Sequence, residues 1–218
     1  MKILFIGNSY TFFSDMPEIF RSLCEENGRA VEVHSVTKGG RRLIEFQNSE
    51  DACTQKLEAV LSEHSFDTVI LQDHSMISLL DPDAFMTGIG TLAKRMKALG
   101  ARVILYETWG RKTGSPKLEE NGWTHESMAL GIRAAYKRAA ETLGAEISHA
   151  GTAFDYVLEN YPELEMYKED KSHPSYLGSC LIAAVHYKTV FGELPELTET
   201  LKLPTDTVNA FLKAAASL

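Results

Sequence analysis

The chain has few cysteines and none in a metal-binding pattern. Its 218 residues include three, Cys24, Cys53 and Cys180. An odd count without a C-x-x-C motif excludes a disulfide framework and a zinc knuckle. We therefore expect three buried thiols in a reducing compartment. The histidines lack ligand spacing such as H-E-x-x-H, so no bound metal is expected.

An excess of positive charge and a long hydrophobic run are also missing. Lys and Arg number 22 against 30 Asp and Glu, which gives a net charge of -8. This balance argues against nucleic acid or an anionic membrane as a partner. The apolar run at residues 2–6 is too short for a signal peptide, and no stretch is long enough to span a membrane. The sequence thus predicts a cytoplasmic protein.

Phosphate-binding loops are absent as well. The segment Gly7-Asn8-Ser9-Tyr10-Thr11 follows an apolar run, but it matches neither G-x-G-x-x-G nor a P-loop. It also lacks the second glycine of the G-x-S-x-G elbow of α/β-hydrolases. No cofactor is expected from these motifs. Taken alone, Ser9 reads as a turn or helix-cap serine.

Short apolar runs alternate with longer amphipathic ones, and this alternation is typical of a parallel sheet covered by helices. With 44% hydrophobic residues, the chain is long enough to bury a sizeable core. We expect one domain over residues 1–218, a flavodoxin-like three-layer α/β/α sandwich with a five-stranded parallel sheet in the order 2-1-3-4-5. The expected strands are 2–6, 30–36, 68–71, 102–106 and 145–148. The expected helices are 16–26, 52–62, 82–99, 125–143, 152–160, 175–191 and 205–216.

The sequence places a serine, an aspartate and a histidine where the loops of this expected fold would carry an active site. Ser9 follows the first strand, and Asp170 and His173 lie three residues apart before a late helix. A serine nucleophile needs a base, and a histidine base needs an orienting carboxylate. The carboxyl ends of the strands are where ligands bind in such sheets. The sequence therefore predicts acyl transfer.

These segments resemble the blocks of the SGNH (GDSL-type) hydrolases. The Gly-Asn-Ser-Tyr run at 7–10 is similar to the first block, and Asp170-x-x-His173-Pro174 is similar to the last. Gly40 takes the place of the second-block glycine, and residues 69–75 take the place of the third block. The resemblance extends over essentially the whole chain.

The resemblance implies a role for each of these residues. Ser9 would be the nucleophile, His173 the base and Asp170 the orienting acid. The oxyanion hole would consist of the Ser9 amide, the Gly40 amide and one side-chain amide. Asn8 replaces the usual aspartate, and the usual Gly-x-Asn of the third block is missing, so Gln72 is expected to supply that donor.

The connection between Trp109 and Trp123 is long and irregular, and long loops are often functional. Both rings are candidates to stack on a sugar, although packing against the protein body is an equal expectation. His74 and Glu107 are expected near the strand ends in supporting positions. The pair Arg41-Arg42 is expected to be solvated.

The favoured function is a carboxylic ester hydrolase acting on a small-molecule O-acyl ester, for example an acetylated carbohydrate. One alternative is a flavodoxin-like module that binds phosphate or flavin at the hydroxyl-rich loop after the first strand. A second is an inactive relative that binds carbohydrate through Trp109 and Trp123. The sequence predicts no oligomeric state.

Overall fold

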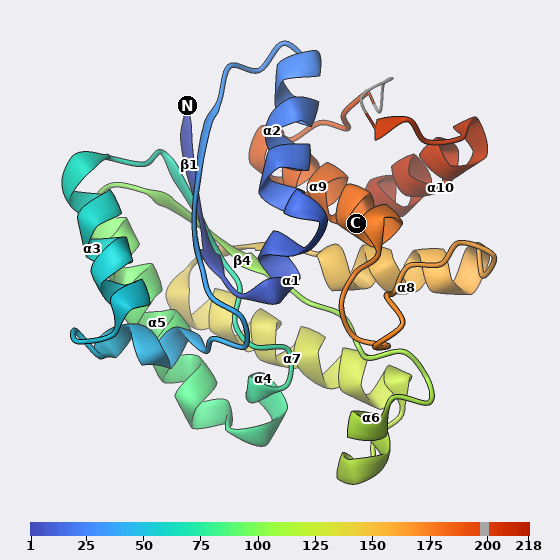
Figure 1. Cartoon of the computed structure of the whole chain (residues 1–218), viewed down its shortest axis with the longest axis horizontal. Coiled ribbons are helices and arrows are strands. Elements are labelled where there is room, and N and C mark those ends of the chain that lie inside the picture. The colour runs from blue at the N-terminus through green and yellow to red at the C-terminus, as the bar shows by residue number, and fades with distance from the viewer. Residues whose placement is uncertain (197–200) are drawn as a thin grey trace.

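A computed structural model of the chain describes residues 1–196 and 201–218. Five strands form one parallel sheet in the order β2-β1-β3-β4-β5, as predicted. They are β1 (Lys2–Gly7), β2 (Glu32–Thr37), β3 (Thr68–Leu71), β4 (Arg102–Tyr106) and β5 (Glu146–Ser148). Helices cover both faces of the sheet (Figure 1), which confirms the three-layer α/β/α fold.

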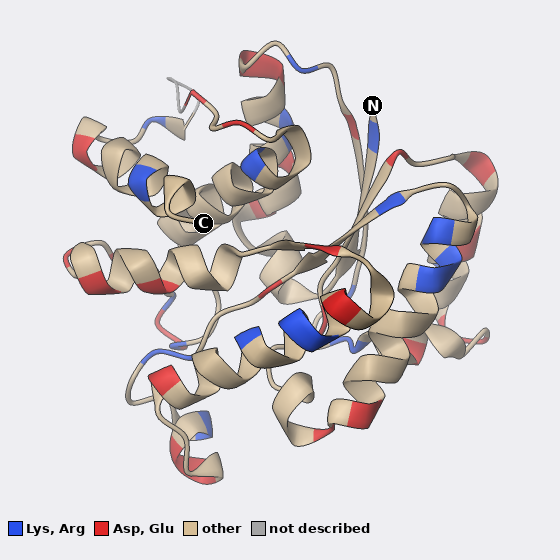
Figure 2. Ribbon diagram, turned by 180° about the vertical axis from the view of Figure 1, so that it is seen from behind, with Lys and Arg blue, Asp and Glu red and all other residues tan. Residues whose placement is uncertain are grey.

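The helices divide into two groups. The group on one face includes α2 (Met16–Glu26), α8 (Ala150–Asn160), α9 (Tyr176–Phe191) and α10 (Thr205–Ala216). The group on the other face includes α3 (Ala52–Glu63), α5 (Pro82–Ala98) and α7 (His125–Leu143). Figure 1 shows the sheet edge-on between these two groups. Figure 2 shows acidic and basic residues on the helices of both groups.

The alternation of side chains along the strands builds two cores. In β1, Ile3 and Phe5 pack with the α2–α9 side, while Leu4 and Ile6 pack with the α3–α5 side. Successive residues of a strand face opposite sides of the sheet, so a continuous apolar run is what a doubly covered strand requires. Burying each such side chain stabilises the fold by about 1.5–3 kcal/mol.

Five short elements among the described residues were not predicted. They are α1 (Ser9–Phe12), the 3-10 turns η1 (Phe13–Asp15) and η2 (Leu43–Gln47), α4 (Ile77–Leu80) and α6 (Pro116–Asn121). Elements of one or two turns are too short to show a hydrophobic period. Four of them, α1, η2, α4 and α6, are the first elements after β1, β2, β3 and β4, so they shape the loops at the carboxyl end of the sheet. The three cysteines are buried and free, as expected.

Some boundaries differ from the expected ones for local reasons. Ser14 and Asp15 both have positive φ, 53° and 55°, and the Asp15 side chain does not cap α2. Helix α9 begins at Tyr176 rather than at Ser175, because the Ser175 hydroxyl accepts a hydrogen bond from the Gly178 amide and so acts as the N-cap. Pro174, which comes just before this N-cap, pairs with Tyr167 in an isolated bridge.

The register of the sheet aligns the loops of interest. Gly7 pairs with Thr37, and Ile6 pairs with Leu71, so β1, β2 and β3 end at one level. The chain segments that follow carry Ser9, Gly40 and Gln72. Within residues 1–196 and 201–218, no helix combines the length and the hydrophobicity that a membrane crossing requires.

Candidate active site

The predicted triad residues are in contact. The Ser9 Oγ and the His173 Nε2 are 2.8 Å apart, although 164 residues separate them in sequence. The Asp170 Oδ2 is hydrogen-bonded to the His173 Nδ1, and the Asp170 Oδ1 accepts from the backbone amides of Ser172 (3.0 Å) and His173 (2.9 Å). An acceptor at Nδ1 leaves Nε2 free to accept the serine proton.

The carboxylate of Asp170 is held in its ionised form. Partial burial alone would raise its pKa, but the hydrogen bonds from the His173 ring and the two amides outweigh this effect and lower it. The side chains of His173 and Asp170 are 24% and 47% exposed, so the triad lies at the surface rather than in a closed cavity.

The loop that carries the triad acid and base docks on an aromatic stack. Trp109 lies between Tyr10, at 4.7 Å, and Phe154, at 4.5 Å, with near-parallel rings. Its Nε1 donates to the Ser172 carbonyl at 3.1 Å. The Tyr10 hydroxyl and the Ser172 hydroxyl are 2.6 Å apart. These contacts fix the chain on the N-terminal side of His173.

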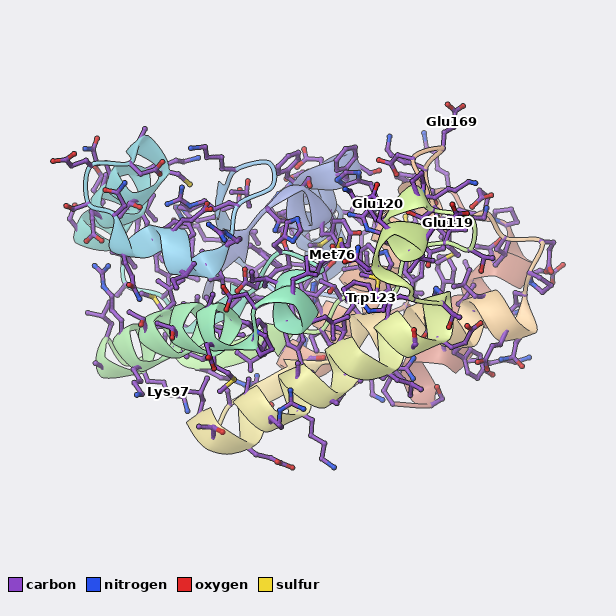
Figure 3. All side chains as sticks on the ribbon, turned by 90° about the horizontal axis from the view of Figure 1, so that it is seen from below. Met76, Lys97, Glu119, Glu120, Trp123 and Glu169 are labelled. Atoms are coloured by element: carbon purple, nitrogen blue, oxygen red, sulfur yellow. The ribbon has the colours of Figure 1, made fainter. Side chains whose placement is uncertain are left out.

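Trp109 is therefore a positioning residue, which agrees with the expected packing against the protein body and not with the expected stacking on a sugar. It is fully buried, and both faces of its ring are occupied by other aromatic rings. Trp123 is half-buried and packs on the α3–α5 side of the sheet. Figure 3 shows it next to α6 and the start of α7, whereas Glu169 projects from the tip of the triad loop. A role for Trp123 in binding stays a prediction.

Gln72 is buried and hydrogen-bonded at both ends of its side-chain amide. Its side chain is fully buried, and its Oε1 accepts from the Asn8 amide and the Thr11 hydroxyl, both at 2.9 Å. Its Nε2 donates to the Asp73 carbonyl. Two donors on Oε1 fix the orientation of the amide, and the Asp73 carbonyl takes one of the two N–H groups of Nε2. The buried amide therefore has structural partners at both ends, and the oxyanion role expected for Gln72 stays a prediction.

Gln72 supports the loop after β1 through its contacts with Asn8 and Thr11. A Cβ on Gly7 would lie 2.6 Å from the Thr11 Oγ1 and 2.7 Å from the Gln72 Oε1. The glycine is thus required by the close approach of these side chains, independently of any turn conformation.

Asn8 links the loop after β1, which carries Ser9, to the loop after β2, which carries Gly40. Its Oδ1 accepts from the Tyr10 amide at 3.1 Å, and its Nδ2 donates to the Arg41 carbonyl at 2.9 Å. An aspartate at this position would have no N–H to donate. Gly40 precedes Arg41 and has a φ of 68°, a conformation that favours glycine. In the described residues, no hydrogen-bond partner is seen for the amide of Ser9 or of Gly40.

Arg41 is buried, which corrects the expectation of a solvated arginine pair. It contacts the Asp51 carboxylate at 2.7 Å, the Thr54 hydroxyl at 2.8 Å and the Glu45 carbonyl at 3.0 Å. The second loop is thereby anchored to the start of α3. Arg42 is exposed and pairs with Glu45, so only this residue fits the expectation.

Asp73 links the loop after β2 to the loop after β3. It is fully buried, and its Oδ1 accepts from the amides of Leu43 (2.9 Å) and His74 (2.7 Å). Within the described residues, its Oδ2 has no partner. Burial raises the pKa of this carboxyl group to about 7, because an ionised carboxylate is poorly solvated there.

His74 follows directly and is half-buried. Its Nδ1 lies 3.3 Å from the Met76 amide, which donates to it. The proton of a neutral ring is then on Nε2. Burial lowers the pKa of this imidazole, and the charges of Arg111 and Arg42 lower it further, so the ring stays neutral.

Glu107 has a structural role. It is buried, and its carboxylate accepts from the Thr152 amide (2.9 Å) and the Thr152 hydroxyl (2.8 Å) at the start of α8. The His149 Nδ1 lies 2.9 Å from its other oxygen. Glu107 thus ties β4 to α8 and matches the supporting position expected for it.

No protein-family model and no curated protein matches the chain. Among solved structures, a protein from Slackia heliotrinireducens that is assigned to the SGNH hydrolases is 31% identical, with a TM-score of 0.78 over 87% of this chain and 98% of its own. The chain belongs to the SGNH hydrolase family. The predicted family and the predicted hydrolase class are confirmed.

Two further structures share the fold of this SGNH hydrolase. A DUF4886 family protein from Bacteroides uniformis is 19% identical, with a TM-score of 0.83 over 100% of this chain and 93% of its own. An acetyl xylan esterase from Geobacillus stearothermophilus is 17% identical, with a TM-score of 0.63 over 88% and 95%.

Replacing Asp73 by Asn tests the raised pKa. An aspartate in an unfolded chain titrates near pH 3.9, at about three pH units below Asp73 in the fold. Between about pH 4 and 7 the unfolded chain loses this proton while the folded chain keeps it. The free energy of unfolding therefore decreases as the pH rises through this window.

Asp73→Asn keeps an oxygen acceptor for the Leu43 and His74 amides but cannot ionise. The melting temperature of the variant should rise relative to that of the wild type between pH 5 and pH 8, as measured by calorimetry. A difference that stays constant or shrinks over this range would show that Asp73 is already ionised at pH 5.

Proposed function

We propose that this SGNH hydrolase cleaves small O-acyl esters through a Ser9–His173–Asp170 triad. The observation that carries the proposal is the chain of contacts from Ser9 Oγ to His173 Nε2 and from His173 Nδ1 to Asp170. A nucleophile, a base and an orienting acid in hydrogen-bond contact is the geometry that activates a serine. The contact also argues against an inactive relative with a disrupted triad.

The geometry supports a two-step reaction. The Ser9 Oγ attacks the ester carbonyl carbon while its proton passes to the His173 Nε2. The tetrahedral intermediate collapses, and the alcohol leaves with that proton, which leaves an acyl group on Ser9. A water molecule then gives its proton to His173 and attacks the acyl-enzyme, which releases the acid and restores Ser9.

Three donors support the charge that develops on the carbonyl oxygen. Two are the amides of Ser9 and Gly40, which face no partner in the described part of the chain. For the third we propose the His74 Nε2, since Gln72 is committed to other groups. Its Nδ1 contact with the Met76 amide orients the ring, and its lowered pKa keeps it a neutral donor.

The substrate class we propose is an ester with a small acyl group on a bulky alcohol, for example an acetylated carbohydrate. The partly exposed triad allows a large alcohol to extend into solvent. Acetyl xylan esterases share the fold of this chain, which adds support. A flavin or phosphate module is not favoured, because the Ser9 hydroxyl is engaged by His173 and the chain belongs to a hydrolase family.

Covalent labelling tests the nucleophile. A fluorophosphonate probe should add one label to the wild type at Ser9, and none to Ser9→Ala, as read by peptide mass spectrometry. Turnover of 4-nitrophenyl acetate and of acetylated xylo-oligosaccharides should drop by several orders of magnitude in Ser9→Ala and in His173→Ala. The double variant should be little worse, because such residues act as one unit. A label on another serine would contradict the assignment.

The third donor can be tested by comparing two variants. His74→Ala should lower kcat by about 100- to 1,000-fold with a smaller change in KM, because the donor acts on charge that develops in the transition state. His149→Ala is a matched control, since this histidine pairs with Glu107 outside the triad. A kcat within a few-fold of wild type in folded His74→Ala would exclude this histidine as a donor.

Asn8→Asp tests the link between the first two loops. Aspartate keeps the acceptor for the Tyr10 amide but loses the donor to the Arg41 carbonyl, and it places an anion next to that oxygen. We expect kcat to decrease by about tenfold, because a shift of the Gly40 amide weakens one oxyanion donor. Fluorophosphonate labelling at Ser9 should persist. Unchanged kcat would show that the Asn8–Arg41 contact does not position Gly40.

A further inference from the structure

Two histidines and a glutamate meet at the end of the sheet opposite the triad. The His34 Nε2 lies 2.7 Å from the Glu32 Oε1, and the His64 Nδ1 lies 4.0 Å from the same oxygen. One ligand atom from each side chain can be chosen so that all three lie within 4.8 Å of one another. The two imidazole rings have a centroid distance of 4.4 Å.

The fold explains why this cluster is invisible as a sequence motif. Glu32 and His34 are two apart in β2, so they project from the same face of the strand. His64 is the C-cap of α3, where the chain turns back towards β3. In Figure 1, α3 ends at the same end of the sheet at which β1 begins. Phe66 packs edge-on against His34, at 5.3 Å, and supports the ring.

The three donors match what a zinc ion prefers. Zinc binds imidazole nitrogen and carboxylate oxygen at about 2.0–2.2 Å in a tetrahedral arrangement, which places neighbouring donors about 3.3–3.5 Å apart. The observed separations of 2.7 Å and 4.0 Å lie on either side of this value, so small side-chain rotations bring the atoms to it. Two imidazoles with one carboxylate would leave the fourth position open for water.

We propose that Glu32, His34 and His64 bind a divalent transition-metal ion of the zinc type. Magnesium is not expected there, since it prefers an all-oxygen octahedral set. The site is remote from the triad, because β2 runs for six residues, roughly 17–20 Å, between Glu32 and the loop that carries Gly40. The proposal does not depend on the esterase activity.

The bound ion would join an edge strand to a helix. β2 is at the edge of the sheet and pairs only with β1 among the described strands. A metal bridge from β2 to the end of α3 adds a contact that exists only in the folded chain, so the ion stabilises the fold. Lys2 opposes metal binding, because its Nζ lies 3.2 Å from the Glu32 Oε2 and competes with the ion for the carboxylate.

Titration of the full chain with zinc chloride in a calorimeter tests the site. The wild type should bind one Zn²⁺ per chain, and its melting temperature should rise with zinc but not with magnesium. His34→Gln and His64→Gln, which keep size and polarity, should each weaken binding by at least the 10- to 100-fold typical of losses around metal sites. Cobalt(II) should give visible d–d absorption in the wild type that both variants lose.

Matched controls separate this site from the other histidines. His149→Gln and His173→Gln should retain zinc binding, since neither residue is in the cluster. Lys2→Met should tighten binding, because it removes the competing ammonium group.

The proposal would be overturned by any of three results. The first is no zinc binding at micromolar concentrations by the folded wild type. The second is equal affinity in the wild type and in folded His34→Gln and His64→Gln. The third is a loss of binding confined to His173→Gln, which would place the ion at the triad.

Discussion

The hydrogen bond between Ser9 and His173 is the contact on which the rest of the site depends, and it joins the two ends of the chain. Neither residue is held by a regular strand or a long helix. Ser9 is fixed because β1 ends in a loop held by Asn8, and His173 because its loop docks on Trp109. The buried Trp109 thus orients the surface loop that carries Asp170 and His173. For the proposed triad this matters, since a misplacement of about 1 Å between reacting groups costs about 100-fold in rate.

Buried polar groups connect the three loops that follow β1, β2 and β3. Gln72 accepts from the Asn8 amide, Asn8 donates to the Arg41 carbonyl, and Asp73 accepts from the Leu43 amide. A buried polar group without a partner costs free energy, so these bonds fix each loop in one place relative to the next. Donors that are fixed before the reaction need no reorganisation when charge develops, which is the condition for strong electrostatic stabilisation. Asp73 shows the free-energy cost of this arrangement, since one of its buried oxygens has no hydrogen-bond partner among the described residues.

The sequence predicted the features that follow from periodicity and chain order. The alternation of apolar runs was enough for the strand order, and strand order was enough to bring the loops of Ser9, Gly40 and Gln72 to one edge, whereas the Asp170–His173 pair was assigned by its resemblance to a family block. The sequence did not decide the role of a residue that has two plausible uses. Nothing in composition tells whether the Gln72 amide faces a substrate or the Asn8 backbone, or whether Trp109 lies at a surface or between two rings. The Glu32–His34–His64 cluster was missed because its members come from a strand and from the end of a helix.

In the proposed mechanism His173 is the base and His74 a neutral donor, and the surroundings of the two histidines differ. The His173 Nδ1 is hydrogen-bonded to the carboxylate of Asp170, which leaves Nε2 to take the serine proton. His74 lies in the field of two arginines and accepts a backbone N–H at Nδ1, which opposes protonation. If both rings stood beside carboxylates, they would compete for the serine proton. In the proposed mechanism, these different partners assign the serine proton to His173 and leave His74 to donate, and the charges of Arg111 and Arg42 help to keep His74 neutral.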